Sequence, residues 1–576
     1  MARIRTVEIS NFRSIQSLSW LLSPGLNCLI GPGDAGKSTV LDAIDFAVGA
    51  RRNLTFADTD FHGLQVANPI VISVTLGELP NSLMNVDAYG DFLRGYDLGS
   101  GKLEDEPRKS LETVLTVRLT VTSDLEPAWT LFSERASAQG LERGLAWKDR
   151  VAIAPARIGN NASINLSWAK GSVLNKLSEE RPEMALELAN AAREARAHVG
   201  DKASVQLAGT LATVTTTARN LGVPVGDGAL AMLDAHAVSI NDGAIALHNQ
   251  AGIPLRSLGT GSTRLLIAGL QREAAESATT VLMDEIEYGL EPHRLMRLLD
   301  SLGAKSEPPP LQVVMSTHSP VALRELSGHQ IFVTRKGPVA HQICVAGIGD
   351  DIQSLLRKDP EIFLAKSILV CEGASEVGLV RGYDQYWTEL EAASMLANGW
   401  AYADVGGGDP ERCYRRAKAL LDLGYKVVVF IDADKAPVKE LVDGFHAAGG
   451  STFTWRASRA LEDEIFLSCD DATINDLLNL ALELEPDRVD VNIMSESGGK
   501  KDLGLVQAEY AFGGQKYSPE TRAILGRAAR KRKKGWFKSV TAYQHIAKVL
   551  LGPNHTRSEA GFQLKVNELY ALTHAA

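Results

Sequence analysis

Short apolar runs alternate with polar segments along the first 170 residues. The clearest runs are TVEISNF at 6–12, GLNCLIG at 25–31, IVISVTL at 70–76 and TVLTVRLTVTS at 113–123. Runs of four to eight residues that are rich in β-branched side chains and bounded by turn formers are typical of strands. The pattern therefore predicts that the chain opens with a strand-rich unit.

A helical pattern replaces this alternation at about residue 175. The segment EMALELANAAREARAHV at 183–199 is rich in Ala, Glu and Arg, with apolar residues near helical spacing. We expect helical structure to continue to about Ala235. The insert is interpreted either as a surface helical hairpin or as a dimer contact, and the residues favour neither.

Strands and helices alternate again beyond the insert. TTVLMDE at 279–285 and LQVVMSTHS at 311–319 predict strands, between helical patterns at 262–276 and 291–302. A second series begins with the apolar run before Glu372 and continues with VVVFI before Asp432. Strands that alternate with helices predict an α/β fold with parallel sheets.

The length and these changes of pattern divide the chain into segments. A chain of 576 residues exceeds what one hydrophobic core usually serves. We expect the first α/β domain at 1–172 and 241–345 around the insert at 173–240, then a linker at 346–364, a second α/β domain with a helical insertion at 365–550, and a tail at 551–576.

Composition limits the class of protein. The hydrophobic fraction of 45% and the charged fraction of 23% are those of a soluble globular protein. No apolar run reaches the length of a membrane span, and the N-terminus lacks a signal-peptide core, so we expect a cytoplasmic protein without a membrane partner. The net charge of −10 argues against nucleic acid only if the charge is uniform. Residues 527–538, RAARKRKKGWFK, are strongly basic and contain no acid.

A phosphate-binding motif follows the second predicted strand. GPGDAGKS at 31–38 fits G-x-x-x-x-G-K-[ST], with an apolar strand before it and STVLDAIDFAV after it. Its glycines let the backbone surround phosphates, while the helix N-terminus and the lysine supply positive charge. The alternative, a glycine-rich turn, is disfavoured by this context. The residues expected to contact ATP are Gly31, Gly33, Gly36, Lys37, Ser38 and Thr39.

Two acids follow the strand VLM at 281–283. Asp284 would hold Mg²⁺, and Glu285 is placed to orient or deprotonate the attacking water. Acid pairs after strands are common, but two neighbouring features support this interpretation. SLGTGS at 257–262 opens a predicted helix, and MSTHS at 315–319 ends a strand.

This order of motifs resembles the ABC ATPase superfamily, in the branch shared with SMC-like and RecF-like DNA repair proteins. The opening TVEISNFRSI and the GLEP at 289–292 fit that branch. The resemblance implies that Ser257, Gly259 and Gly261 contact the γ-phosphate bound by another subunit, and that His318 senses it. SLGTGS departs from the full signature of transporters, which implies slow turnover.

Four more acids lie at strand ends in the second half. Asp432 and Asp434 point the same way because strand residues alternate faces. Glu372 ends an earlier strand, and Glu376 lies one helical turn later. Since the carboxyl ends of parallel strands meet at one edge, we expect these acids to gather there. Oxygen ligands suit Mg²⁺ or Mn²⁺, and two such ions can activate a phosphodiester. The alternative is a structural cluster of surface acids.

An E-G followed by D-x-D resembles the Toprim domain of topoisomerases, primases and some nucleases. An ABC ATPase followed by Toprim in one chain resembles the OLD (overcoming lysogenisation defect) nucleases, and specifically class 2, a group that includes the Gabija A subunit. The resemblance implies that Glu462 in LEDEI at 461–465 is another metal ligand. It also implies a catalytic lysine, with Lys534 as first choice and Lys538 as second, which stabilises the phosphate in the transition state. The basic run is interpreted either as a solvated helix face or, because of the aromatic pair beside these lysines, as a segment that faces DNA and neutralises phosphates.

The resemblance implies a DNA endonuclease that uses Mg²⁺ or Mn²⁺ and is regulated by ATP. Glu372, Asp432, Asp434 and the lysine would carry catalysis. It further implies a homodimer or tetramer, a helicase-like partner protein and a role in antiphage defence. The alternative is a non-cleaving, SMC- or RecF-like DNA-binding ATPase that acts as a repair factor or sensor. Primase or topoisomerase chemistry is disfavoured by the accompanying ATPase motifs.

Overall fold

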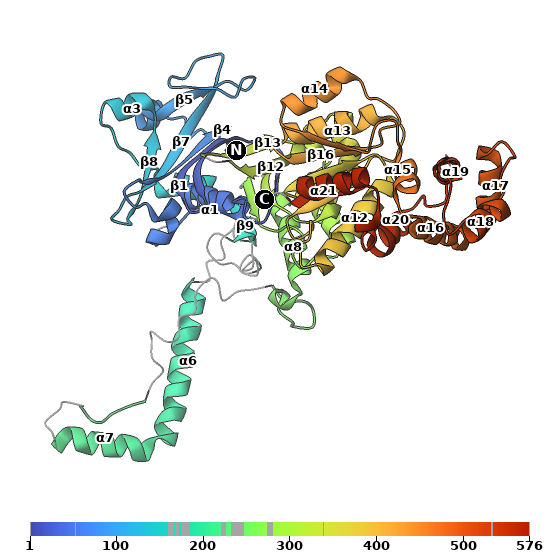
Figure 1. The fold of residues 1–576 in the computed structure, drawn as a ribbon. Helices are drawn as coiled ribbons and strands as arrows, with labels where there is room; N and C mark the ends of the chain where they lie inside the picture. The colour runs from blue at the N-terminus through green and yellow to red at the C-terminus, as the bar shows by residue number, and fades with distance from the viewer. Residues whose placement is uncertain are drawn as a thin grey trace. The chain divides into compact units, whose positions relative to one another are not determined.

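The fold is known from a computed structural model (Figure 1). It describes residues 2–51, 53–158, 166, 172–174, 185–220, 226–231, 247–273, 280–337, 339–531 and 534–574. The chain forms two compact units. One consists of Met1–Cys28 with Ser38–Thr317, and the other of Leu29–Lys37 with His318–Ala576. The predicted α/β class is confirmed, while the predicted segment boundaries stay a prediction.

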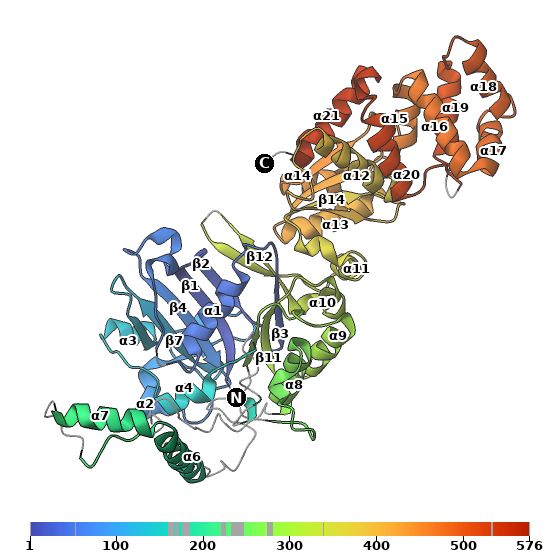
Figure 2. The same ribbon diagram turned by 90° about the horizontal axis from the view of Figure 1, so that it is seen from below.

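An antiparallel sheet dominates the first unit (Figure 2). Its strand order is β2-β1-β4-β7-β5-β6, with β8 beside β7. The strands are β1 (Arg3–Phe12), β2 (Ile15–Leu21), β4 (Ile70–Gly77), β5 (Leu93–Tyr96), β6 (Leu103–Glu104), β7 (Glu112–Val121) and β8 (Pro127–Phe132). The strands predicted at 6–12, 70–76 and 113–123 are confirmed as β1, β4 and β7.

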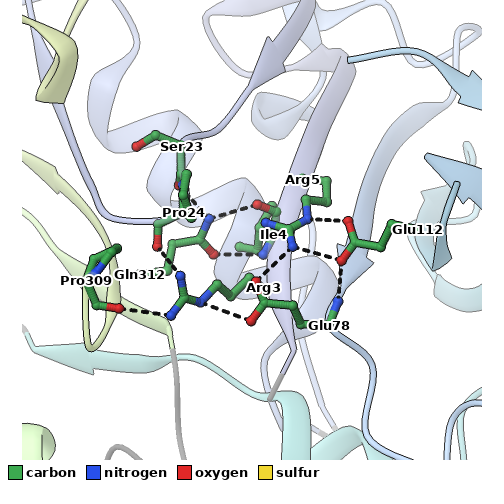
Figure 3. A network of polar contacts seen from close by, with 9 residues as sticks. All are labelled: Arg3, Ile4, Arg5, Ser23, Pro24, Glu78, Glu112, Pro309 and Gln312. Atoms are coloured by element: carbon green, nitrogen blue, oxygen red, sulfur yellow. Dashed lines mark hydrogen bonds and ion pairs between the residues drawn. The ribbon is translucent and has the colours of Figure 1, made fainter. Parts of the chain in front are cut away.

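Hydrogen bonds hold the first residues of β1 to segments that are distant in the sequence (Figure 3). The buried side-chain amide of Gln312 accepts from the N–H of Ile4 at 2.7 Å and donates to its carbonyl oxygen at 2.8 Å. It thus pairs with β1 as a neighbouring strand would. Arg5 donates to both carboxylate oxygens of Glu112 at 2.8 Å. Such two-pronged charged bonds define a single orientation of the strand.

A second sheet has the order β13-β12-β3-β11-β10-β9. The strands are β3 (Leu26–Ile30), β9 (Ala156–Ile158), β10 (Thr280–Met283), β11 (Gln312–Ser316), β12 (Ile331–Lys336) and β13 (His341–Val345). Strand β10 is parallel to β9 and β11. The predicted helical patterns are confirmed as α8 (Thr260–Glu273) and α9 (Pro292–Ser301). Parallel pairing brings the ends of β10 and β11 to the same edge.

The predicted helical insert contains α6 (Ala185–Gln206) and α7 (Ala208–Asn220) (Figure 1). The helix predicted at 183–199 is therefore confirmed for its described part. The stretches 175–184, 221–225 and 232–246 lie outside the described residues, so the prediction of helix up to Ala235 is tested only in part. None of the described helices is both long and apolar enough to cross a membrane.

The second unit contains a parallel sheet of order β15-β14-β16-β17. The strands are β14 (Ser367–Cys371), β15 (Trp400–Asp404), β16 (Lys426–Ile431) and β17 (Ser451–Thr454). Figure 2 shows α12 (Ala374–Glu389) and α13 (Pro410–Asp422) beside β14. All five residues of β14 are buried, as expected of a central parallel strand. The strand order changes direction at β14, where ligand crevices form in such sheets.

Helices complete this unit. They are α14 (Lys439–Ala447), α15 (Leu461–Ser468), α16 (Asp471–Leu484), α17 (Pro486–Glu496), α18 (Leu503–Phe512), α19 (Pro519–Ala529), α20 (Val540–His545) and α21 (Ala560–His574). Trp536 and Phe537 are each 2% exposed and belong to the core. Packing against Phe466 and Tyr543 buries both rings, so the aromatic pair gives no support to a DNA-facing segment. Whether the basic run itself faces DNA stays a prediction.

Candidate functional site

The phosphate-binding loop connects β3 to α1 (Lys37–Val48). Gly31 has a φ of 138°, and a Cβ there would lie 2.5 Å from the carbonyl oxygen of Thr334, so only glycine fits. The buried Lys37 ammonium donates to the carbonyl oxygens of Gly31 at 3.0 Å and Pro32 at 2.8 Å. The lysine therefore lies over the loop, where it can meet phosphate oxygens.

The other predicted residues of this motif lie in the loop and in the first turn of α1. Gly36 has a φ of 81°, and a Cβ at Gly33 would meet nothing within 4 Å. Ser38 is exposed in the first turn of α1, and the Thr39 hydroxyl lies 3.3 Å from that of Ser14. The loop backbone and these hydroxyls are available to a ligand.

Asp284 and Glu285 form a tight turn directly after β10. The Ser316 hydroxyl donates to Asp284 Oδ1, and the Glu285 N–H donates to Ser316 Oγ at 2.9 Å. Glu285 has a φ of 46°, in the left-handed region. A non-glycine residue there stores about 1–3 kcal/mol of strain, which the surroundings must offset. The exposed Glu285 side chain is therefore directed by a constrained backbone.

The end of β11 lies beside the same turn. The Thr317 hydroxyl donates to Glu287 Oε2 at 2.6 Å, and the next residue, His318, is exposed. Sequence reasoning did not select Glu287, although it stands in the run DEIE at 284–287. An acid two residues beyond the pair was the available signal.

The predicted signature segment precedes and opens α8. Ser257 and Gly259 are exposed, whereas Gly261 is buried in the first turn. A Cβ at Gly261 would overlap the carbonyl oxygen of Gly289. The glycine is thus required for the close approach of α8 to the turn after Glu285.

Three of the predicted metal ligands gather at the carboxyl edge of β14 and β16. Glu372 follows β14 and its Oε2 accepts from the Asp432 N–H at 3.3 Å. Asp432 Oδ1 accepts from the Leu461 N–H at 3.0 Å, where α15 begins. Glu376 Oε2 accepts from the Gly373 N–H at 2.7 Å. Strand ends and two helix starts therefore position these acids. Strand β16 ends at Ile431, so the strand alternation expected to point Asp432 and Asp434 the same way does not apply. Their role as metal ligands stays a prediction.

The negative charges of these carboxylates repel one another. Glu376 and Glu462 are 5% and 3% exposed. Burial raises the pKa of Glu376 to about 8, and the charges of Glu462 and Glu372 add to the effect. Burial also raises the pKa of Asp432 well above its usual value, assisted by Glu376 and Glu462. Buried acids that repel one another suit a compensating cation.

A divalent cation fits the chemistry of this donor set, because hard carboxylate oxygens suit Mg²⁺ and Mn²⁺. Among the residues that the structure describes, no three His, Cys, Asp or Glu side chains are grouped in metal-binding geometry. The carboxylates would therefore have to reorient to share an ion.

The structure pairs Lys538 with one of these acids, and it pairs Lys534 with none of them. The Lys538 ammonium donates to Glu462 Oε1 at 2.6 Å. Burial lowers its pKa, but Glu462, Glu376 and Asp432 outweigh burial and raise it. Lys534 is exposed, and its carbonyl oxygen accepts from Asn492 at 2.8 Å. The structure therefore favours the second-choice lysine for a role at the acids.

A cavity of about 710 Å³ opens at this edge. Its lining is Glu372, the loop 406–410, Asp434, Lys435, Arg530 and Lys538. Arg530 Nη1 lies 3.1 Å from Asp463 Oδ2 and 3.6 Å from Asp434 Oδ2. Sequence reasoning missed Arg530 and Lys435. The basic run 527–538 was the available signal for Arg530, but the run did not show which of its residues would reach the cavity.

Comparisons with known proteins match parts of the chain. The DNA replication and repair protein RecF of Moorella thermoacetica is 42% identical over 48 residues, which are 8% of this chain and 13% of that protein. The chain thus spans a small fraction of that relative's length.

Two solved structures are similar at low identity. One is an Smc head domain with an extended coiled coil, bound to the C-terminal domain of ScpA derived from Pyrococcus furiosus. It has 12% identity and a TM-score of 0.31, covering 60% of this chain and 96% of that chain. The recombination mediator protein RecF with ATP has 8% identity and a TM-score of 0.29, covering 60% of this chain and 99% of that chain. Similarity at this level carries no conclusion about function.

One family model covers most of the first half. The model described as AAA domain, putative AbiEii toxin, Type IV TA system matches residues 26–324, from β3 to α10 (Pro320–Glu325). That match includes the phosphate-binding loop and the acid pair after β10. Because it spans more than half of the chain, the chain belongs to this family of ATPase domains.

Proposed function

We propose that the chain is a divalent-metal-dependent DNA endonuclease whose activity is regulated by its ATPase domain. The single observation that carries the nuclease proposal is the set of buried acids at the edge of β14 and β16, with Lys538 bound to one of them. The proposal assigns residues 365–550 to a Toprim-like domain and the whole chain to an OLD-type nuclease of class 2.

The acids and the lysine have distinct roles in this proposal. The ligands for Mg²⁺ or Mn²⁺ are Glu372, Glu376, Asp432, Asp434 and Glu462. The ions, when bound, supply Lewis acidity and an activated water for phosphodiester hydrolysis. Lys538 holds its positive charge beside the acids and stabilises the charge that develops on the phosphate. The cavity beside them, whose lining includes Lys435, Arg530 and Lys538, would receive the DNA backbone.

The ATPase domain provides the regulation. Lys37 binds phosphate oxygens, Asp284 holds Mg²⁺, and Glu285 orients the attacking water. Ser257, Gly259, Gly261 and His318 respond to the γ-phosphate. ATP binding then controls access of DNA to the second site.

The remaining assignments follow from the OLD resemblance. They are a homodimer or tetramer built partly through the insert at 173–240, a helicase-like partner protein, a cytoplasmic location and a role in antiphage defence.

A second candidate is a non-cleaving DNA-binding ATPase of the RecF type. The identity of 42% over 48 residues with a protein named for DNA replication and repair favours it. The two candidates differ in one property, which is whether the acids at β14 and β16 cleave DNA.

The deciding experiment incubates supercoiled and linear DNA with the full chain and Mg²⁺ or Mn²⁺. The nuclease proposal predicts cleavage that Glu372→Gln abolishes. Glu389→Gln, an exposed α12 acid paired with Lys548 at 2.7 Å, is the control that retains it. DNA binding without cleavage by the wild type, or cleavage that Glu372→Gln leaves unchanged, would reject the nuclease.

A further inference from the structure

Arg264 is a buried arginine of α8, and its side chain contacts the turn that follows β10. It is 2% exposed and lies in the second turn of α8. Its guanidinium donates to the carbonyl oxygens of Asp284 at 2.9 Å, Glu285 at 2.8 Å and Tyr288 at 3.1 Å. One side chain therefore holds most of the turn that carries the acid pair.

The chemistry of this contact requires arginine. A buried positive charge is unfavourable unless polar partners replace its lost water, and three carbonyl oxygens do so. The planar guanidinium presents several N–H groups in a fixed fork, whereas a lysine ammonium is a single point on a flexible stem. Lysine at position 264 would keep the charge but could not hold three separate carbonyl oxygens in the same way.

The turn needs support from its surroundings, because Glu285 adopts a left-handed backbone conformation that residues other than glycine rarely adopt. Ser316 holds one side of the turn by accepting from the Glu285 N–H and donating to Asp284. Arg264 holds the other side through the carbonyl oxygens. The main chain of Glu285, and with it the direction in which its side chain leaves the backbone, is thus held between α8 and β11.

The start of α8 contacts the end of the same turn. Gly261 approaches the Gly289 carbonyl so closely that a Cβ would overlap it. The Arg294 side chain, from α9, donates to the Ser262 hydroxyl at 2.9 Å. The segment 257–259 leads directly into the first turn of α8 at Thr260. Because α8 is packed tightly against the turn, a displacement of that first turn is transmitted to Arg264.

We propose that Arg264 is a positioning residue for ATP hydrolysis, which sets Glu285 through the main chain and couples that acid to the segment 257–261. The inference rests on the proposed role of Glu285. In this role Arg264 acts on the main chain of the turn, and not on the nucleotide or the attacking water.

The test measures steady-state ATP hydrolysis and nucleotide binding by the full chain. Arg264→Gln should lower kcat by about 10- to 100-fold with KM changed less than about threefold, because misplaced catalytic groups lose rate rather than binding. Arg264→Lys should fall between Arg264→Gln and wild type. Arg272→Gln, on the exposed last turn of α8, is the control and should match wild type. If Arg264→Gln does not fold, Arg264→Lys carries the test.

A double-mutant cycle with Glu285→Gln separates positioning from general stability. If Arg264 acts through Glu285, adding Arg264→Lys to Glu285→Gln should lower kcat by less than about twofold. An equal fold-loss in both backgrounds, or loss of nucleotide binding by Arg264→Lys, would overturn the inference. Wild-type turnover by Glu285→Gln alone would instead overturn the proposed role of Glu285.

Discussion

The Lys538 ammonium lies 2.6 Å from the buried Glu462 carboxylate, although 76 residues separate them in the chain. The pair joins the segment after α19 to the first turn of α15. Glu462 is 3% exposed, and the Lys538 ammonium takes the place of part of the water that its carboxylate lacks. The contact places one cation among the acids at the edge of β14 and β16.

Replacement of Lys538 and of Lys534 should have different effects on the rate of DNA cleavage. Lys538→Met should lower the rate of DNA cleavage by about 100-fold, because removal of one preorganised group that stabilises transition-state charge has this effect. Lys534→Met is the matched control and should retain the wild-type rate, since Lys534 does not line the cavity, whereas Lys538 does. The reverse order of the two variants in a nicking time course would contradict the assignment.

Glycines on α12 allow α20 to pack closely in the second unit. A Cβ at Gly378 would lie 2.8 Å from the Cβ of Tyr543. Gly378→Ala should therefore lower the free energy of unfolding by about 1–3 kcal/mol through overpacking. Gly444→Ala is the control on α14, where a Cβ meets nothing within 4 Å, and should stabilise by about 0.5–1 kcal/mol. Urea midpoints measure both, and a neutral Gly378→Ala would contradict the tight packing.

Glu509 should make stability depend on acidity. Burial raises its pKa, but hydrogen bonds from Lys501, Thr521 and Ser518, each 2.6 Å long, outweigh burial and lower the pKa to about 2. Because the folded pKa lies below the ordinary glutamate value of 4.5, the stabilisation is complete above pH 4.5 and disappears as the pH falls towards 2.

The thermal midpoint should test this pH dependence. Between pH 4.5 and 2, the midpoint of Glu509→Gln should fall less steeply than that of the wild type. Glu483→Gln, on the exposed side of α16, is the control. Parallel curves for wild type and Glu509→Gln would show that Glu509 does not carry this stability.

Local patterns predicted the elements and the motifs that lie within one segment. The strand β14 and its following acid could be predicted because a buried parallel strand needs a continuous apolar run, and the next residue stands at the sheet edge. The phosphate-binding loop was predictable for a similar reason, since its glycines, lysine and flanking elements are contiguous.

Contacts between distant segments could not be predicted in this way. The choice of Lys538 over Lys534 depends on Trp536 and Phe537, whose burial fixes which lysine meets the acids. The basic run with its two aromatic residues suggested a surface that faces DNA, but both aromatic rings are packed in the core. Arg264 looks like any helical arginine in the sequence, and only its three carbonyl partners reveal its place.

The central claim is that an ATPase domain regulates a nuclease site in the same chain. The most direct measurement is the rate of plasmid nicking with Mg²⁺ or Mn²⁺, with and without ATP, for wild type, Lys37→Ala and Asp432→Asn. The account predicts that Asp432→Asn does not nick under either condition, and that Lys37→Ala nicks at a rate that no longer responds to ATP. Nicking by Asp432→Asn at the wild-type rate, or an unchanged ATP response in Lys37→Ala, would contradict it.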